Sequence, residues 1–365
     1  MITQYMMKRI TLLSIFGYTG IYLKIILLTL SVASCSYMGD KNITGESVRI
    51  LTPIFRDTIE SNDFIIARPG SIARDSKGNI FVVDIFQHRL VKFSPEGIFM
   101  KYIGQRGEGP GEFLFPQIRI DSNDIMYVLD TPLRRVSLFD SDGLYLSSFT
   151  YDGPRVSGFS VNSNGRIALM QPQIDKPLIF IYDTDGSVID SIGFTKSFGT
   201  DLNPVPTPDA TYAYNRGMIR FNSRGELVII YVQRPVMQRY SQDGHLLTEV
   251  SIHGNEIENL TNLYNHRVEM ALKQGGSRNM VFLFTYFYGF DFIDDNTIAI
   301  NLANEQCIYI VNTDGNHVEN IRLLPDNSMD IDTVDLRGLE ITKNGQFIGV
   351  DTNNLIIWTG ILDNF

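Results

Sequence analysis

Four arginines occupy a recurring position that could bind an anion. Each lies eight to ten residues before a tight turn that recurs along the chain, and they are Arg68, Arg155, Arg216 and Arg337. Guanidinium groups pair with carboxylates and phosphates through paired hydrogen bonds. Four tyrosines lie in the same loops: Tyr212, Tyr214, Tyr286 and Tyr288. Together they predict a ligand-binding rim for an anionic or carboxylate-bearing ligand; bridging of neighbouring loops and aromatic loop packing are the alternatives.

Catalytic chemistry finds less support in the sequence. The five histidines are scattered, and neither an HxH nor an HExxH spacing occurs. A Gly-x-Ser-x-Gly elbow, which presents a nucleophilic serine, is absent as well. We therefore expect no catalytic residue, no metal and no cofactor, and leave enzymatic activity open.

Repeated four-stranded units must position these residues. Residues 69–104 read as four short strands joined by three turns. The first turn of each unit aligns Gly78, Asp124, Gly165, Gly225, Asn296 and Gly345. The second recurring turn aligns Gly97, Gly143, Gly186, Gly244 and Gly315. The position six residues before the first turn is apolar in every unit. Such self-similarity predicts an all-β fold, a β-propeller of four-stranded blades.

The ends of the chain set the number of blades at six. After Gly345 there is room for two more strands, but the chain stops before a further one. An extended run at residues 48–54 precedes the first unit and has no partner there. We expect it to add itself as the missing outer strand of the last blade, which closes the ring and removes an open sheet edge.

Two long connections interrupt the repeat. Apolar residues recur at helical spacing over residues 255–271, which predicts one helix inserted between blades four and five. Asn255 and Glu258 resemble a capping pair, and two glycines at 275–276 would end the helix. Residues 196–215 carry three prolines and no strand alternation, so they are expected to form a long loop.

The topology of a four-stranded blade predicts where function lies. The first and third turns of each blade share one face, while the second turn and the connection to the next blade share the other. All the long segments are such connections, which we call crossovers. Because binding residues concentrate on loops held by a rigid scaffold, the crossover face is the predicted contact surface.

Composition and charge narrow the class of partner. The chain has 365 residues, of which 44% are hydrophobic and 20% are charged, as in ordinary globular proteins. Its formal net charge is −10. An acidic chain of this kind is not expected to bind nucleic acid.

The N-terminal residues read as a targeting segment. Lys24 is followed by an apolar run at 25–30 and by small residues up to Cys35. The pattern resembles a bacterial lipoprotein signal, in which the peptide is cut before the cysteine and the thiol is lipidated; a transmembrane helix over residues 10–33 is the alternative. We expect a signal peptide at 1–34, a tether at 35–47 and a propeller at 48–365. The protein would then be anchored to a membrane of the bacterial cell envelope, on the periplasmic or outer-membrane side, through lipid on Cys35.

Blade one carries the residues of a known repeat. The run GSIARDSKGNIFVVD at residues 70–84, followed by Arg89, Leu90, Val91 and Phe93, resembles an NHL-type repeat, and residues 121–139 are a weaker copy. With the GEGPGEF stretch at 107–113 and the lipoprotein signal, the chain is similar to six-bladed propeller lipoproteins of uncharacterised function from bacterial cell envelopes. This resemblance implies binding of a protein, peptide or glycan more than catalysis.

The resemblance also implies structural roles for two pairs of residues. Asp84 with Arg89, and Asp130 with Arg135, match the NHL aspartate and arginine positions. We expect each pair to join across the turn between the second and third strands and to tie adjacent blades together.

An envelope hydrolase or lyase acting in the central channel is the alternative function. Some NHL-type propellers are zinc lyases, and metal-dependent lactonases share the propeller architecture. A lactonase-like metal site needs inward-facing carboxylates and amides. The carboxylates near the right level are Asp291, Asp335 and Glu340, and the first and last of these follow the apolar column by one residue.

Overall fold

A computed structural model describes residues 47–53, 66–199, 206–275, 281–303, 305–314, 317–325, 336–342, 345–351 and 356–362. The predicted signal peptide, the predicted lipid site at Cys35 and the candidate Asp335 lie outside these residues. Arg337 lies in a described strand, but its side chain is not among the described ones. In the described part of the chain, no helix combines the length and apolar character needed to cross a membrane.

The described strands form six successive antiparallel blades. Blade one comprises β2 (Pro69–Arg74), β3 (Ile80–Asp84), β4 (Arg89–Phe93) and β5 (Phe99–Ile103). Blade two comprises β8 (Pro116–Ile120), β9 (Met126–Asp130), β10 (Arg135–Phe139) and β11 (Tyr145–Thr150). Blade three comprises β12 (Gly158–Val161), β13 (Ile167–Met170), β14 (Pro177–Tyr182) and β15 (Val188–Phe194).

The second half of the chain repeats the arrangement. Blade four comprises β16 (Gly217–Phe221), β17 (Leu227–Tyr231), β18 (Val236–Tyr240) and β19 (Leu246–Ser251). Blade five comprises β20 (Phe287–Phe292), β21 (Thr297–Leu302), β22 (Cys307–Asn312) and β23 (His317–Pro325). Blade six comprises β24 (Leu336–Ile341), β25 (Gln346–Asp351) and β26 (Ile356–Ile361). A short parallel pair, β6 (Gln105–Arg106) and β7 (Glu112–Phe113), lies in the crossover from blade one to blade two.

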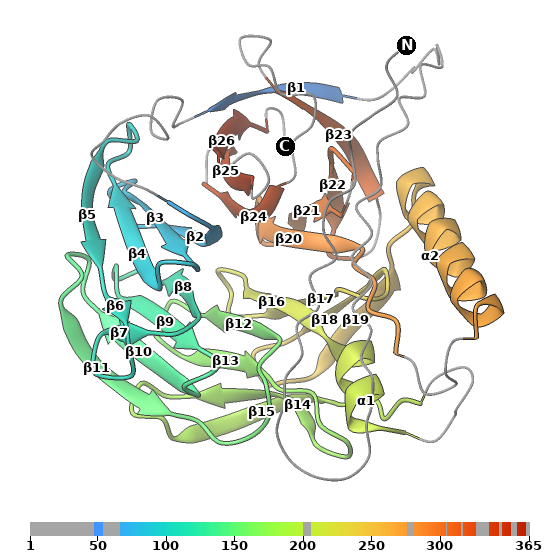
Figure 1. The fold of residues 1–365 in the computed structure, drawn as a ribbon, viewed down its shortest axis with the longest axis horizontal. Coiled ribbons are helices and arrows are strands. Elements are labelled where there is room, and N and C mark those ends of the chain that lie inside the picture. Colours follow the sequence, from blue (N-terminus) through green and yellow to red (C-terminus); the bar gives the residue numbers. More distant parts are fainter. Residues whose placement is uncertain are drawn as a thin grey trace. The chain divides into compact units, whose positions relative to one another are not determined.

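The blades close into a ring through their inner strands. Each inner strand contacts those of the blades before and after it, from β2 through β8, β12, β16, β20 and β24 back to β2 (Figure 1). This arrangement confirms the predicted all-β propeller with six blades.

Strand β1 (Ser47–Pro53) closes the ring in a way the sequence only partly predicted. Its last two residues pair with β26, so it does take the outer position of blade six. Its first five residues, however, pair in parallel with β23, the outer strand of blade five. β1 therefore joins blades five and six into one eight-stranded sheet, and it covers two sheet edges rather than one.

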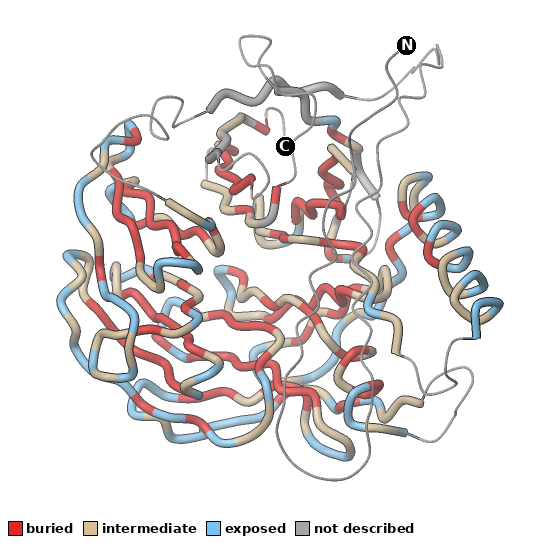
Figure 2. The backbone as a smooth tube through the Cα atoms, viewed as in Figure 1, coloured by how far each residue is buried: buried red, intermediate tan, exposed pale blue. Residues whose placement is uncertain are grey.

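The core consists of apolar clusters that each join two neighbouring blades. Ile72, Val82 and Val91 of blade one pack with Ile348 and Val350 of blade six, for example. Corresponding clusters lie at each of the other blade interfaces, and buried residues run along the middle strands of all blades (Figure 2). Burial on both faces explains why these strands are almost continuously apolar. It also fixes the blades against one another, so the loops at either end stand on a rigid frame.

The tight turns follow the predicted columns. Gly78, Gly165, Gly225 and Gly345 adopt positive φ at the first turn, and Asp124 takes the same left-handed conformation with φ 60°. First turns of neighbouring blades also bond directly, since the Ser76 amide and hydroxyl donate to the Asp124 carboxylate at 2.7 and 2.6 Å. We call the face formed by these turns the tight-turn face.

The structure contains both the predicted helix and one that was not predicted. α2 (Asn255–Lys273) lies between blades four and five as expected, and it buries Ile257, Leu260 and Tyr264 against the core. Its N-cap is Gly254 without a side-chain bond, so the predicted Asn255 capping pair is wrong. Within the predicted loop at 196–215, residues Pro208–Asn215 form α1, whose N-cap Thr207 accepts a hydrogen bond from the Ala210 amide.

Candidate functional site

Buried aspartates tie the crossovers to the blades. Asp84 is fully buried, and its carboxylate accepts hydrogen bonds from the amides of Ala67 and Arg68 at 2.9 and 3.1 Å. Asp130 accepts in the same way from Leu114 and Phe115 at 2.6 and 3.1 Å. Since each aspartate ends the second strand of its blade, the second turns and the crossovers share one face, as predicted.

The arginines of the NHL-like positions bind something other than their aspartates. In blade two, the Arg135 guanidinium donates to the carbonyls of Glu108 and Glu112 in the preceding crossover, at 2.7 and 2.5 Å. In blade one, the Arg89 guanidinium lies 3.5 Å from the centre of the Tyr102 ring. The predicted side-chain pairing of Asp130 with Arg135 is therefore wrong, because both bind crossover backbone instead. Both side chains hold the crossover that leads into blade two, and the predicted tying of adjacent blades stays a prediction.

Two of the four predicted rim arginines come together on the crossover face. Arg155, before β12, lies with its guanidinium 5.8 Å from the ring centre of Tyr212 on α1. Arg216, before β16, interacts electrostatically with Tyr212 and Arg155. Burial lowers the pKa of Arg216; Tyr212 raises it, and Arg155 lowers it further. Neither arginine has a carboxylate within ion-pair distance in the described part of the chain. Arg68 is exposed at the start of blade one.

Tyr214 belongs to an adjacent aromatic and cationic cluster. Its ring stacks on Phe198 with centroids 4.1 Å apart, and the Arg234 guanidinium lies 4.6 Å from it. Arg234 also covers the Tyr231 ring at 3.6 Å, and Lys196 lies 5.5 Å from Tyr214. Tyr212 and Tyr214 are two residues apart on α1, so the helix presents one tyrosine to each cluster. Phe198, Lys196 and Arg234 were not predicted as site residues.

The other two predicted tyrosines have different surroundings. Tyr286 is 7% exposed and packs edge-on against Tyr264 of α2 at 5.2 Å, with its hydroxyl bonded to Thr261 at 3.0 Å. Tyr286 therefore takes part in aromatic loop packing, which was the alternative to ligand binding. Tyr288 is half-buried on the inner strand β20.

A ring of mostly polar side chains surrounds the propeller axis. Its members lie five residues before each first turn, one residue after the apolar column: Ala73, Arg119, Ser160, Arg220, Asp291 and Glu340. Most of them bond to the inner strand of the next blade. Arg119 Nε donates to the Phe159 carbonyl at 3.2 Å, and Ser160 accepts from the Phe221 amide at 3.1 Å. The sequence contains this column at constant spacing, but only Asp291 and Glu340 were predicted to lie near the channel.

Arg220 holds both acids of the axial ring. Its guanidinium lies 2.6 Å from Glu340 and 3.9 Å from Asp291, and it donates to the Leu339 carbonyl at 3.3 Å. Burial would lower the pKa of Arg220, but the two carboxylates outweigh it and raise the pKa. Burial raises the pKa of Asp291 to about 6 despite Arg220, with Glu340 adding to the rise.

The axial ring does not fit the metal that a lactonase-like reaction would need. Asp291 already accepts amide hydrogen bonds from Phe292 at 2.9 Å and Ile341 at 2.7 Å, and Glu340 is engaged by Arg220. Arg74 also lies close enough to interact with Glu340. Together with Arg119 and Arg220 it makes three arginines around two acids, so the local charge is positive and disfavours a metal cation. Among the described residues, no group of three or more histidines, cysteines or acids gathers as metal ligands do.

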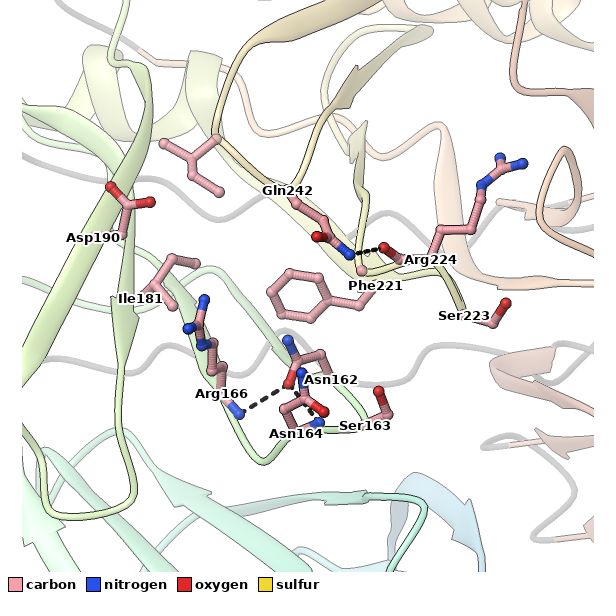
Figure 3. A pocket seen from close by; sticks show the side chains of 12 residues that line it. Asn162, Ser163, Asn164, Arg166, Ile181, Asp190, Phe221, Ser223, Arg224 and Gln242 are labelled. Carbon is pink, nitrogen blue, oxygen red and sulfur yellow. Dashed lines mark hydrogen bonds between the residues drawn. The ribbon is translucent and has the colours of Figure 1, made fainter.

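A hollow of about 330 Å³ lies on the tight-turn face between blades three and four. The turns at 162–166 and 222–225 form its walls, with Gln242 beside them (Figure 3). Arg166 extends between Ile181 and Phe221, whereas the Arg224 guanidinium turns away to Asn296 at 2.7 Å. The lining offers amide and guanidinium groups around one aromatic ring, and it was not singled out from the sequence.

Comparisons with known proteins agree with the fold. Residues 59–165 match the family DUF5128, described as a 6-bladed beta-propeller. The chain is 26% identical over 134 residues to protein brain tumor of Drosophila melanogaster and 27% identical over 119 residues to human NHL repeat-containing protein 3. These alignments span 35% and 30% of this chain, but only 12% and 34% of the two relatives.

Two solved structures resemble the whole ring. A protein of Bacteroides fragilis described as exported superposes with a TM-score of 0.55 at 12% identity, covering 89% of this chain and 98% of its own. A streptogramin B lyase superposes with a TM-score of 0.51 at 13% identity, covering 87% and 88%. At such identity the likeness concerns the fold alone. Together with the closed ring, these findings show that the chain is a six-bladed β-propeller, part of which is similar to NHL-repeat proteins.

Proposed function

We propose that this propeller is a non-catalytic binding module of the bacterial cell envelope, anchored by lipid at Cys35, that holds its ligand on the crossover face. The observation that carries the proposal is the group formed by Arg155, Tyr212 and Arg216. The Arg155 guanidinium lies over the Tyr212 ring, Arg216 interacts electrostatically with both residues, and neither arginine has a carboxylate partner among the described residues. On a chain of net charge −10, such a group favours an anionic ligand.

The ligand class follows from the chemistry of this group. Guanidiniums bind carboxylates through paired hydrogen bonds, and aromatic rings pack on sugar rings or on peptide side chains. The neighbouring cluster of Phe198, Tyr214 and Arg234 extends the same chemistry beside α1. A carboxylate-bearing peptide, protein segment or glycan suits this surface.

The described residues of the channel offer no carboxylate that is free to act in catalysis. Asp291 and Glu340 are the acids that a lactonase-like site would use, and both are bound to Arg220. A hydrolase or lyase therefore remains the alternative function, without a specific observation in its favour.

Binding to arrays of peptides and glycans tests the proposal. The purified protein is compared with the double variant Arg155→Ala/Arg216→Ala, and Arg166→Ala serves as control because Arg166 is exposed on the opposite, tight-turn face. We expect carboxylate-bearing probes to bind the parent and the control alike and the double variant on the order of tenfold more weakly. Unchanged binding by the double variant would remove the proposal.

The lipid anchor is tested separately by cell fractionation. We expect the parent protein in the membrane fraction and Cys35→Ala in the soluble fraction, because the lipidated thiol is the proposed attachment. Membrane retention of Cys35→Ala would contradict anchoring through this residue while leaving the binding proposal intact.

A further inference from the structure

Among the described residues, one arginine at the propeller axis has no direct counter-charge. Arg220 takes both carboxylates of the axial ring, Glu340 at 2.6 Å and Asp291 at 3.9 Å. Arg119 comes from a different blade, and no carboxylate of the described residues lies within 4.0 Å of its guanidinium. The acids therefore serve one arginine and leave the other without a direct counter-charge.

The bonds of Arg119 leave part of its guanidinium unused. Nε donates to the Phe159 carbonyl at 3.2 Å, and Nη1 donates to the Ile118 carbonyl at 2.8 Å. Nη2 has no hydrogen-bond partner among the described residues, and the side chain is half-buried, so part of its surface remains accessible. Arg220 likewise keeps Nη1 unused, since its bonds run from Nε and Nη2.

Electrostatics show the same deficit. Burial, with repulsion from Arg220 as the next cause, lowers the pKa of Arg119 to about 9, although Glu340 and Asp291 act in the opposite direction. A guanidinium that is desolvated and lacks a counter-charge is stabilised by an incoming anion, because the interaction is stronger in a medium less polar than water.

We propose that a small oxyanion, a carboxylate or phosphate group, binds at the propeller axis between the guanidiniums of Arg119 and Arg220. Nη2 of Arg119 and Nη1 of Arg220 supply the hydrogen-bond donors. This axial site is separate from the group on the crossover face, because Arg119 and Arg220 stand near the tight-turn ends of their inner strands, whereas Arg155 and Arg216 precede theirs.

The pH dependence of the axial site follows from the groups that face it. Arg220 on β16, Asp291 on β20 and Glu340 on β24 are the charged groups that act on Arg119. Protonation of Asp291 as the pH falls through about 6 removes a negative charge, so the anion binds more tightly there.

Titration calorimetry with inorganic phosphate and with acetate tests the site on the purified full chain, with chloride holding the ionic strength constant. We expect saturable binding of one equivalent, weakened on the order of tenfold or more in Arg119→Met. The matched control is Arg166→Met, which removes an exposed arginine without an ion pair on the tight-turn face. It should bind as the parent does.

Two further results separate this proposal from a merely structural role for Arg119. Asp291→Asn should bind the anion more tightly at pH 7, because a competing negative charge is gone. Arg119→Lys keeps a charge, and should retain part of the binding even if Arg119→Met folds poorly. Absence of saturable binding to the parent, or equal binding by Arg119→Met and the parent, would overturn the proposal. Acetate and phosphate binding compared side by side show which oxyanion is preferred.

Discussion

Arg220 at the propeller axis and the arginines of the crossover face lie under opposite conditions. At the axis, Arg220 reaches from blade four to carbonyls and acids of blades five and six, and its charge is matched. On the crossover face, Arg155 lies over the Tyr212 ring, Arg216 interacts with both, and neither has an ion pair with an acid of the described residues. The same residue type thus holds the ring together in one place and stays available in the other.

The difference teaches how to separate structure from function in a repeat protein. Charges that the chain itself satisfies across a blade interface are expected to control stability. Charges that it leaves unmatched at the surface are expected to control binding.

Replacing Arg220 should have the largest effect on stability. Arg220→Met leaves Asp291 and Glu340 without their cation in a poorly solvated place, which typically costs about 3–5 kcal/mol in the free energy of unfolding. Urea denaturation followed by fluorescence measures it. Adding Asp291→Asn and Glu340→Gln to the variant should restore much of the loss, and failure of this rescue would show that the cost does not come from uncompensated charge.

Replacing Asp130 should cost less, about 2–3 kcal/mol, because several amides then lose their acceptor without losing a charge partner. Asp130→Ala deprives Leu114 and Phe115 of bonds at 2.6 and 3.1 Å. Denaturation midpoints of Asp130→Ala and of Asp142→Ala, whose carboxylate is 83% exposed, give the comparison. Equal midpoints would mean that the crossover is held by other contacts.

Asp291 should give the ring a recognisable dependence on pH. The pKa of this carboxyl is raised by burial to about 6 in the folded chain, above its ordinary value of 3.8. The folded state therefore holds a proton that the unfolded state has released, so this contribution to stability is present below pH 3.8 and is lost as the pH rises through about 6. Asp291→Asn should remove that decline, which urea denaturation across pH 4 to 7 measures against the parent. Parallel pH profiles for the two proteins would contradict the raised pKa.

The sequence predicted the frame of the molecule better than its sites, for a physical reason. Apolar residues and turn glycines recur in every blade because every blade solves the same packing problem, so Ile72 and Gly78 identify the repeat. The next column differs in each blade, from Arg119 to Ser160 to Asp291, since its members meet only when the ring closes. Their convergence depends on contacts between residues far apart in the chain.

Two further features of the structure were not predicted. The first had a recognisable local sequence signal, and the second depends on a contact between distant residues. Thr207 and Pro208 are an N-cap and a first helical residue, so α1 could have been recognised. The parallel pairing of β1 with β23 joins Ser47 to Ile321, and nothing near either residue specifies it.

The smallest effect on stability is expected for the crossover group, and it completes the comparison. Arg155→Met and Arg216→Met remove charges that no carboxylate of the described residues balances, and burial already lowers the pKa of Arg216, so its charged form gains little from folding. Each variant should unfold within about 0.5 kcal/mol of the parent, as surface substitutions usually do. A loss as large as that of Arg220→Met would show that these arginines hold loops together, and the crossover face would then lose its claim to be the binding surface.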